Sequence, residues 1–139
     1  MNDLLRRQAA LKATLTRWGK LKHKWETGRH CVALAREHAV NMGHTPPALP
    51  RLRSLLGARR ALKERGWANA MAMLDALFPA IPVASALPGD LVVVMAAEDD
   101  LGAVLIAIEP HKFAGWREDA PRLVVLDLDW VDVTKAYRL

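Results

Sequence analysis

The sequence predicts an α+β fold in which N-terminal helices pack on a C-terminal antiparallel β-sheet. Through residue 78, apolar side chains recur every three or four residues, which is the spacing of one face of a helix. From Pro79 onward the pattern changes to short apolar, β-branched runs, such as residues 91–95, which are typical of buried strands. Because the helical patterns come first and the strand patterns follow, we expect the strands to pair antiparallel.

Helical spacing and stop signals such as Gly19 and Gly66 predict the helices of the first part of the chain. We expect them at residues 4–18, 31–42, about 51–65 and 67–78. The apolar faces of the first, third and fourth helices comprise Leu4, Leu11, Leu15 and Trp18; then Leu52, Leu55, Leu56, Ala58 and Leu62; then Trp67, Ala70, Met71, Leu74, Leu77 and Phe78. Residues 44–50 hold three prolines and form a connector, because proline has no N–H to donate.

A meandering sheet is expected in the second part. The strands fall at residues 91–95, 102–108, 113–116, 122–126 and 134–139. Pro88-Gly89-Asp90 forms a turn before the first strand, and the polar residues 98–100 form the hairpin loop that joins it to the second.

Length and composition describe one ordinary globular domain, residues 1–139. Apolar residues make up 52% and charged residues 25%, and no run approaches the roughly 20 apolar residues of a membrane helix. The N-terminal residues carry charge without a following apolar run, so we expect no signal peptide and folding in a cytoplasm. One cysteine, Cys31, cannot form an internal disulfide and is expected to be a free thiol.

The two halves of the chain carry opposite charge. Residues 1–75 hold 15 Lys and Arg against 5 Asp and Glu, a net +10, whereas residues 76–139 hold 5 against 10, a net −5. A basic half suits nucleic acid, a solvated helical surface or an acidic neighbouring subunit. The basic residues gather on the third helix and at residues 20–24, where Trp18 and Trp25 could stack on bases, although helical spacing favours a core position for Trp18.

Four motifs in order resemble a known family. The first motif leads into the second helix and is Trp25-x-x-Gly28-Arg29-His30-Cys31. Two strand motifs follow, Pro88-Gly89-Asp90-Leu91-Val92-Val93 and Leu101-Gly102-Ala103-Val104-Leu105, and the last motif is Ala136-Tyr137-Arg138-Leu139. This order, from residue 4 to 139, resembles small tailed-phage tail-tip proteins of NlpC-like fold, a compact branch of the papain-like cysteine peptidases.

The resemblance implies a place for a catalytic cysteine and its base. The nucleophile of active relatives lies at the start of the helix packed on the sheet, which is Cys31 here, and the base at the start of the second strand. That position falls at Leu101 or Gly102, and neither is a histidine. The family pattern has an aspartate immediately before the cysteine, and here His30 occupies that position. If the pattern is matched without a gap, Cys31 falls on the aspartate position and Val32 on the nucleophile position. The resemblance therefore implies a degenerate peptidase site and no catalytic residue.

Two histidines elsewhere in the chain, His111 and His38, are candidate bases for Cys31. His111 lies about nine residues beyond position 102, roughly 30 Å along an extended strand, and reads as an exposed loop residue. It is the candidate partner of Cys31 if the protein is active. His38 lies seven residues after Cys31 and about 10 Å away by helical rise, which is too far for direct proton transfer.

No metal or cofactor is expected. His30, Cys31 and His38 or His23 lack the paired short spacings of structural zinc motifs. Asp127, Asp129 and Asp132 alternate with apolar residues as in a half-exposed strand or turn, without the glycine of a calcium loop.

We therefore expect a non-catalytic structural component of a phage tail tip or baseplate, assembled in the bacterial host cytoplasm. Its expected partners are the hub and distal-tail proteins, with multiple copies in a symmetric assembly and no membrane. The alternative is a tail-associated cysteine peptidase that acts on cell-wall peptidoglycan. A third class, a basic nucleic-acid-binding module, predicts salt-dependent DNA binding that the other two do not.

Overall fold

The computed structural model describes residues 3–24, 29–48, 50, 52–96, 101–116 and 122–139. The helices in these residues are α1 (Asp3–Trp18), α2 (Cys31–Asn41), α3 (Leu55–Glu64) and α4 (Ala70–Leu77), with short 3₁₀ turns η2 (Val83–Ser85) and η3 (Trp130–Asp132). The strands are β1 (Ala80–Ile81), β2 (Leu91–Val94), β3 (Ala103–Glu109), β4 (Lys112–Gly115), β5 (Val124–Asp127) and β6 (Lys135–Tyr137). The predicted α+β class with an antiparallel sheet is confirmed.

The sheet has the strand order β1-β6-β2-β3-β4-β5, and every pairing is antiparallel. Strands β2 to β5 form the expected meander. The prediction of a simple meander is wrong for the last strand, because β6 returns across the sheet and pairs with β2 and β1. The two-residue β1 was not predicted, and the expected hairpin loop at residues 98–100 lies outside the described residues.

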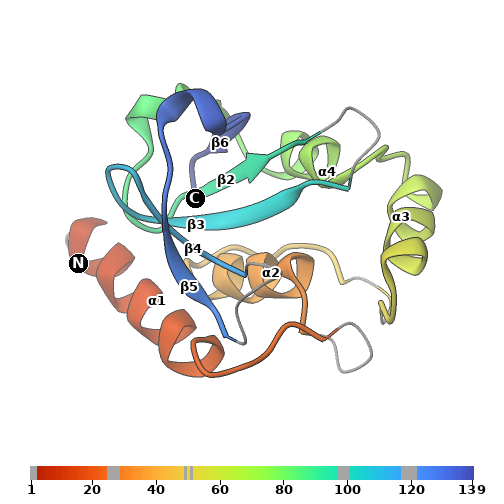
Figure 1. The fold of residues 1–139 in the computed structure, drawn as a ribbon, viewed down its shortest axis with the longest axis horizontal. Helices are drawn as coiled ribbons and strands as arrows, with labels where there is room; N and C mark the ends of the chain where they lie inside the picture. Colours follow the sequence, from red (N-terminus) through yellow and green to blue (C-terminus); the bar gives the residue numbers. More distant parts are fainter. Residues whose placement is uncertain (1–2, 25–28, 49, 51, 97–100, 117–121) are drawn as a thin grey trace.

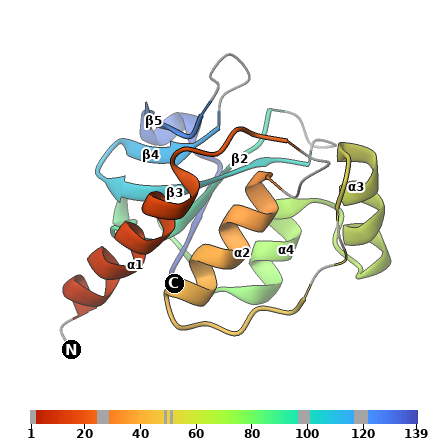
Figure 2. The same ribbon diagram turned by 90° about the horizontal axis from the view of Figure 1, so that it is seen from below.

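The sheet has one face covered by helices and one covered by turns. Helices α1, α2 and α4 lie along one side of the sheet, while α3 stands at its margin (Figures 1 and 2). Alternate strand residues such as Val93 and Ile106 join the helix-side cluster, whereas Val92 and Leu105 pack on the other face with Trp130 of η3. This period of two is the pattern of a sheet buried on both faces.

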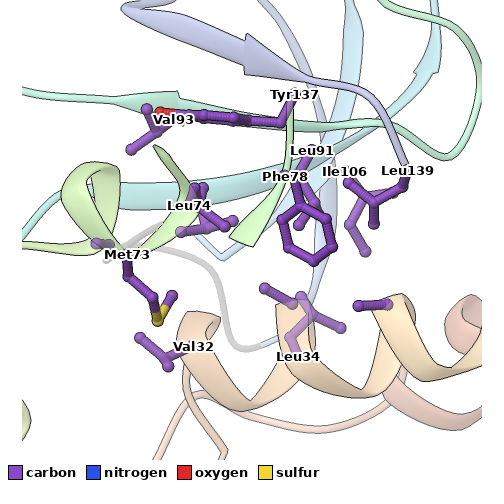
Figure 3. Packing of buried hydrophobic residues seen from close by; sticks show 14 of the residues in the cluster. Val32, Leu34, Met73, Leu74, Phe78, Leu91, Val93, Ile106, Tyr137 and Leu139 are labelled. Carbon is purple, nitrogen blue, oxygen red and sulfur yellow. The ribbon is translucent and has the colours of Figure 1, made fainter. Parts of the chain in front are cut away.

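Helix α2 lies at the centre of the core. Val32 and Leu34 point from it toward Met73, Leu74 and Phe78 of α4 and its end, as Figure 3 shows. Met73, Leu74 and Phe78 also approach the sheet residues of the same cluster, among them Leu91, Ile106 and Tyr137. The helical pattern around Cys31 therefore marks the packing joint between helices and sheet.

The predicted helices exist, but two begin later than expected. Helix α3 begins after Ser54, whose hydroxyl accepts the Gly57 N–H, and α4 begins after Asn69, whose carbonyl oxygen accepts the Ala72 N–H. A capping side chain that satisfies a free N–H decides the start more than apolar spacing does. No helix among the described residues is long and apolar enough to cross a membrane.

Some predicted core positions are exposed. Leu4 is 51% exposed, and Leu55 and Leu56 of α3 are 44% and 59% exposed. The predicted Ala58 and Leu62 are buried, together with Ala61, because α3 contacts the core through a narrow face at the margin of the sheet. Trp18 is buried, as its spacing predicts, while Trp25 lies outside the described residues.

A buried ion pair joins the two ends of the described chain to the turn before β2. Asp90 is fully buried, and its Oδ1 accepts hydrogen bonds from Arg7 Nη1 at 2.8 Å and from the Leu139 N–H at 2.9 Å. Its Oδ2 accepts the Leu87 N–H at 2.9 Å and lies 3.1 Å from Arg138 Nε. The Pro-Gly-Asp motif, predicted only as a turn, thus supplies the central acceptor that links α1, β2 and β6.

Candidate functional site

Cys31 is the first residue of α2, and His30 caps the helix. His30 has extended backbone angles, and its Nδ1 accepts the Ala33 N–H at 3.1 Å. A side-chain acceptor at this position satisfies one of the N–H groups that the first helical turn leaves unpaired. The cap explains why the helix starts at Cys31, and it occupies the Nδ1 lone pair of the neighbouring imidazole.

Backbone groups surround the Cys31 thiol. Its Sγ lies 4.0 Å from the carbonyl oxygen of Gly102, toward which the S–H points as a weak donor. Burial raises the pKa of the thiol above its ordinary value, and the N–H groups of Val104 and Val32 only partly oppose this. No imidazole hydrogen-bonds Cys31 in the part of the chain that the structure describes. A nucleophilic thiol needs the opposite conditions, a lowered pKa and an adjacent base.

The position expected to carry the base lies beside the thiol, but it holds no side chain. Gly102 has φ +92°, in the left-handed region that favours glycine. A Cβ built there would lie 2.5 Å from Met95 Sδ and 3.2 Å from Val93 Cγ2. The space that a histidine would need is therefore filled by two side chains of β2 and its end.

His111 and His38 are held away from Cys31. His111 lies in the turn between β3 and β4, and its Nδ1 pairs with the Leu128 carbonyl oxygen at 3.0 Å. It sits at the opposite end of β3 from Gly102, roughly 20 Å along the strand. His38 is fully buried on α2, where its Nε2–H donates to the Gly89 carbonyl oxygen at 2.8 Å and its Nδ1 accepts from Thr14 Oγ1 at 2.7 Å.

His23 is the imidazole that the structure brings into the same groove as Cys31. Its ring meets Trp116 edge to face, with centroids 5.4 Å apart, and burial lowers its pKa. Burial and the neighbouring His23 together lower the pKa of His30 to about 4. Both rings are therefore neutral at pH 7. The sequence brought up His23 only in a metal site that its spacing argues against, because a position eight residues before Cys31 carries no pattern that places it in a groove.

The groove itself has a volume of about 380 Å³ and lies between the N-terminal part of α3 and the first residues of β3. Its lining comprises His23, Cys31, Leu55, Arg59, Val94, Ala96, Leu101, Gly102, Ala103, Val104, Leu105 and Trp116. The Nε of Arg59 is buried and has no hydrogen-bond partner. Arg59 is one of the basic residues of the third helix, and only the fold reveals that it lines the groove.

The possible metal-ligating side chains do not gather in one place within the described residues. No group of three or more His, Cys, Asp or Glu is arranged to hold a metal ion there. His38 turns to Thr14 and Gly89, and His30 to the helix cap. Asp127 of β5 pairs with Lys112 at 3.0 Å, while Asp129 and Asp132 flank the η3 turn.

A comparison with solved structures identifies the class of fold. The chain is similar to the crystal structure of the NlpC/p60 domain of the peptidoglycan hydrolase SagA, with a TM-score of 0.61 over 100% of both chains and 14% sequence identity. This likeness shows an NlpC/p60-like fold. A family model described as a domain of unknown function (DUF6950) matches residues 4–139, and the chain belongs to that family. No curated protein matches the sequence.

Proposed function

We propose that this chain is a non-catalytic NlpC-like domain that works as a structural component of a phage tail tip. The proposal that the domain is non-catalytic is supported by the environment of Cys31. Its thiol faces a glycine where the scaffold would offer a base, and burial raises its pKa. A thiol whose protonated form is favoured, and which hydrogen-bonds no imidazole among the described residues, lacks the two conditions that activate a cysteine nucleophile.

The tail-tip part rests on the order of sequence motifs from residue 4 to 139, which resembles small tail-tip proteins. The expected partners are hub and distal-tail proteins, and the expected site is the virion, after assembly in the host cytoplasm. Opposite net charges, +10 for residues 1–75 and −5 for residues 76–139, suit a domain held between unlike neighbours.

Location in the particle tests this proposal. Antibody against the chain, bound to gold, is applied to purified virions of the phage that encodes it, and tail fractions are analysed by mass spectrometry. We expect label at the distal end of the tail and a fixed copy number per particle. Absence of the chain from purified particles would contradict the proposal.

The alternative function is a tail-associated cysteine peptidase that acts on peptidoglycan. One observation favours it, because His23 lines the same groove as Cys31 and burial keeps its imidazole neutral and able to accept a proton. It predicts hydrolysis that is lost in both Cys31→Ala and His23→Ala. Hydrolysis that survives either substitution, or no hydrolysis at all, would remove this alternative.

A further inference from the structure

The η3 turn projects an apolar residue between two acids. Val131 is 91% exposed, although a large apolar side chain in a soluble protein is rarely displayed so fully. Asp129 and Asp132 flank it, are exposed, and pair with no described side chain. We call residues 129–132 the η3 tip.

The η3 tip is held in one shape. The ring of Trp130 lies against that of His111, with centroids 4.1 Å apart, and packs on the turn-covered face of the sheet. The Asp132 N–H donates to the Asp129 carbonyl oxygen at 3.0 Å, which closes the turn. A tip already fixed in shape loses little conformational entropy when it binds a partner.

The groove beside α3 has complementary chemistry. Its walls are mainly apolar, with the 44%-exposed Leu55 and the half-buried Trp116 among them. Arg59 supplies a positive charge there and makes no hydrogen bond or ion pair with any described residue. A buried donor without a partner is rare in native proteins, because the unmet hydrogen bond costs free energy. The groove therefore suits an apolar side chain accompanied by a carboxylate.

We propose that the η3 tip of one copy of this chain docks in the groove of a second copy. Val131 enters between the apolar walls, and the carboxylate of Asp129 or Asp132 pairs with Arg59. Tip and groove are different surfaces, so each copy can still offer its tip to one neighbour and its groove to another. Such a head-to-tail contact builds rings when the rotation closes and filaments when it does not.

The partner in this contact is a second copy of the chain. Its biological setting, a phage tail tip, rests on the function proposed above. The local charges have complementary signs, because Arg59 lines the groove and the tip carries Asp129 and Asp132. Attraction between the two should steer association and weaken as salt is added.

Sedimentation velocity of the purified chain tests the contact. The wild-type chain should show a mass that rises with concentration beyond that of a dimer and falls at high salt. Arg59→Glu and Val131→Asp should each raise the dissociation constant by about tenfold or more, as the loss of an interface anchor does. Arg60→Glu, an exposed α3 neighbour of Arg59 outside the groove lining, is the matched control and should change it by less than about twofold.

Sedimentation of a mixture of the two defective variants tests the tip-to-groove contact most directly. The Arg59→Glu chain keeps its tip and the Val131→Asp chain keeps its groove, so the mixture should form dimers that grow no further. Thermal melts of both variants should match the wild type, and Arg59→Gln provides a milder change of the groove. A wild-type chain that stays monomeric, or a mixture without dimers, overturns the contact. The tail-tip location would be unaffected by that result, because particle labelling measures it separately.

Discussion

At the scale of single residues, the proposed function requires that Cys31 does not act as a nucleophile. The thiol sits at a helix N-terminus, where backbone N–H groups favour a thiolate. Burial outweighs that effect and raises its pKa. Its main neighbour is the carbonyl oxygen of Gly102, which accepts from a thiol and repels a thiolate. Both effects favour the protonated thiol of Cys31 over the thiolate.

Alkylation of Cys31 should be slow at neutral pH. We expect iodoacetamide to react at least about tenfold more slowly than with the same chain unfolded in urea, because the thiolate is the reacting form. The rate should rise with pH and reach half its maximum above pH 9.0, the ordinary value for a thiol. A rate that levels off near pH 7 would show an activated thiol and contradict this account.

Two buried histidines should make the protein less stable in acid. Burial lowers the pKa of His30 to about 4 and lowers that of His38 below its ordinary 6.5. Below pH 6.5 the unfolded chain therefore binds more protons than the folded one, so the free energy of unfolding falls as pH drops from 6.5 toward 4. The slope that either His30 or His38 contributes is at most about 1.4 kcal/mol per pH unit, because each takes up at most one proton on unfolding.

Chemical denaturation between pH 7 and 4 measures this slope. His38→Gln should flatten it and cost about 1–3 kcal/mol at pH 7, because Thr14 and Gly89 lose well-placed partners. His111→Asn changes an exposed turn and should leave the slope intact. An equal slope in wild type and His38→Gln would exclude His38 as a source of acid sensitivity.

At the scale of elements, the start of β3 decides whether the scaffold can offer a base. Gly102→Ala should cost about 1–3 kcal/mol, from the left-handed backbone and from contact with Met95 and Val93. Gly43→Ala is the matched control, because Gly43 also has positive φ but nothing within 4 Å of the added Cβ. Adding Met95→Ala should recover the excess cost of Gly102→Ala over Gly43→Ala. Equal costs at the two glycines would mean that space is available at position 102.

The junction of α1, β2 and β6 depends on Asp90. Asp90→Ala should lower the free energy of unfolding by about 3–5 kcal/mol, because the buried guanidinium of Arg7 loses its buried carboxylate partner and keeps only the exposed Asp3. Asp127→Ala removes a carboxylate from the exposed pair with Lys112 and should cost no more than about 1 kcal/mol. Urea denaturation measures both, and similar losses would contradict the central role of Asp90.

The spacing of apolar residues predicts whether a segment is a helix or a strand. It does not predict which segments contact one another in the fold. The periodicity of residues 4–18 and 67–78, and the β-branched run at 91–95, predict local structure because burial of one face imposes that period. The return of β6 to pair with β2 depends on long-range hydrogen bonds that no local pattern records. The candidate site was predictable at Cys31 and position 102 through the resemblance, but His23 and Arg59 enter it only by tertiary packing.

At the scale of the whole molecule, the fold is NlpC/p60-like, and the function proposed above does not use it for cleavage. The NlpC/p60-like fold of this chain places a helix start, a strand start and a groove together. In this chain the strand start carries a glycine, and the groove carries an arginine with an unpaired Nε. Such a groove is better suited to binding a partner than to cleaving one, which agrees with the principle that function lies in the site and not in the fold.

The most direct test is the release of soluble fragments from purified bacterial peptidoglycan by the wild-type chain and by Cys31→Ala. The Cys31→Ala chain should remain folded, with a loss of about 1 kcal/mol at most for one buried sulfur, as its melting curve will report. We predict equal, background release from both chains at pH 5 to 9. Release by the wild-type chain that disappears in Cys31→Ala would contradict the non-catalytic account.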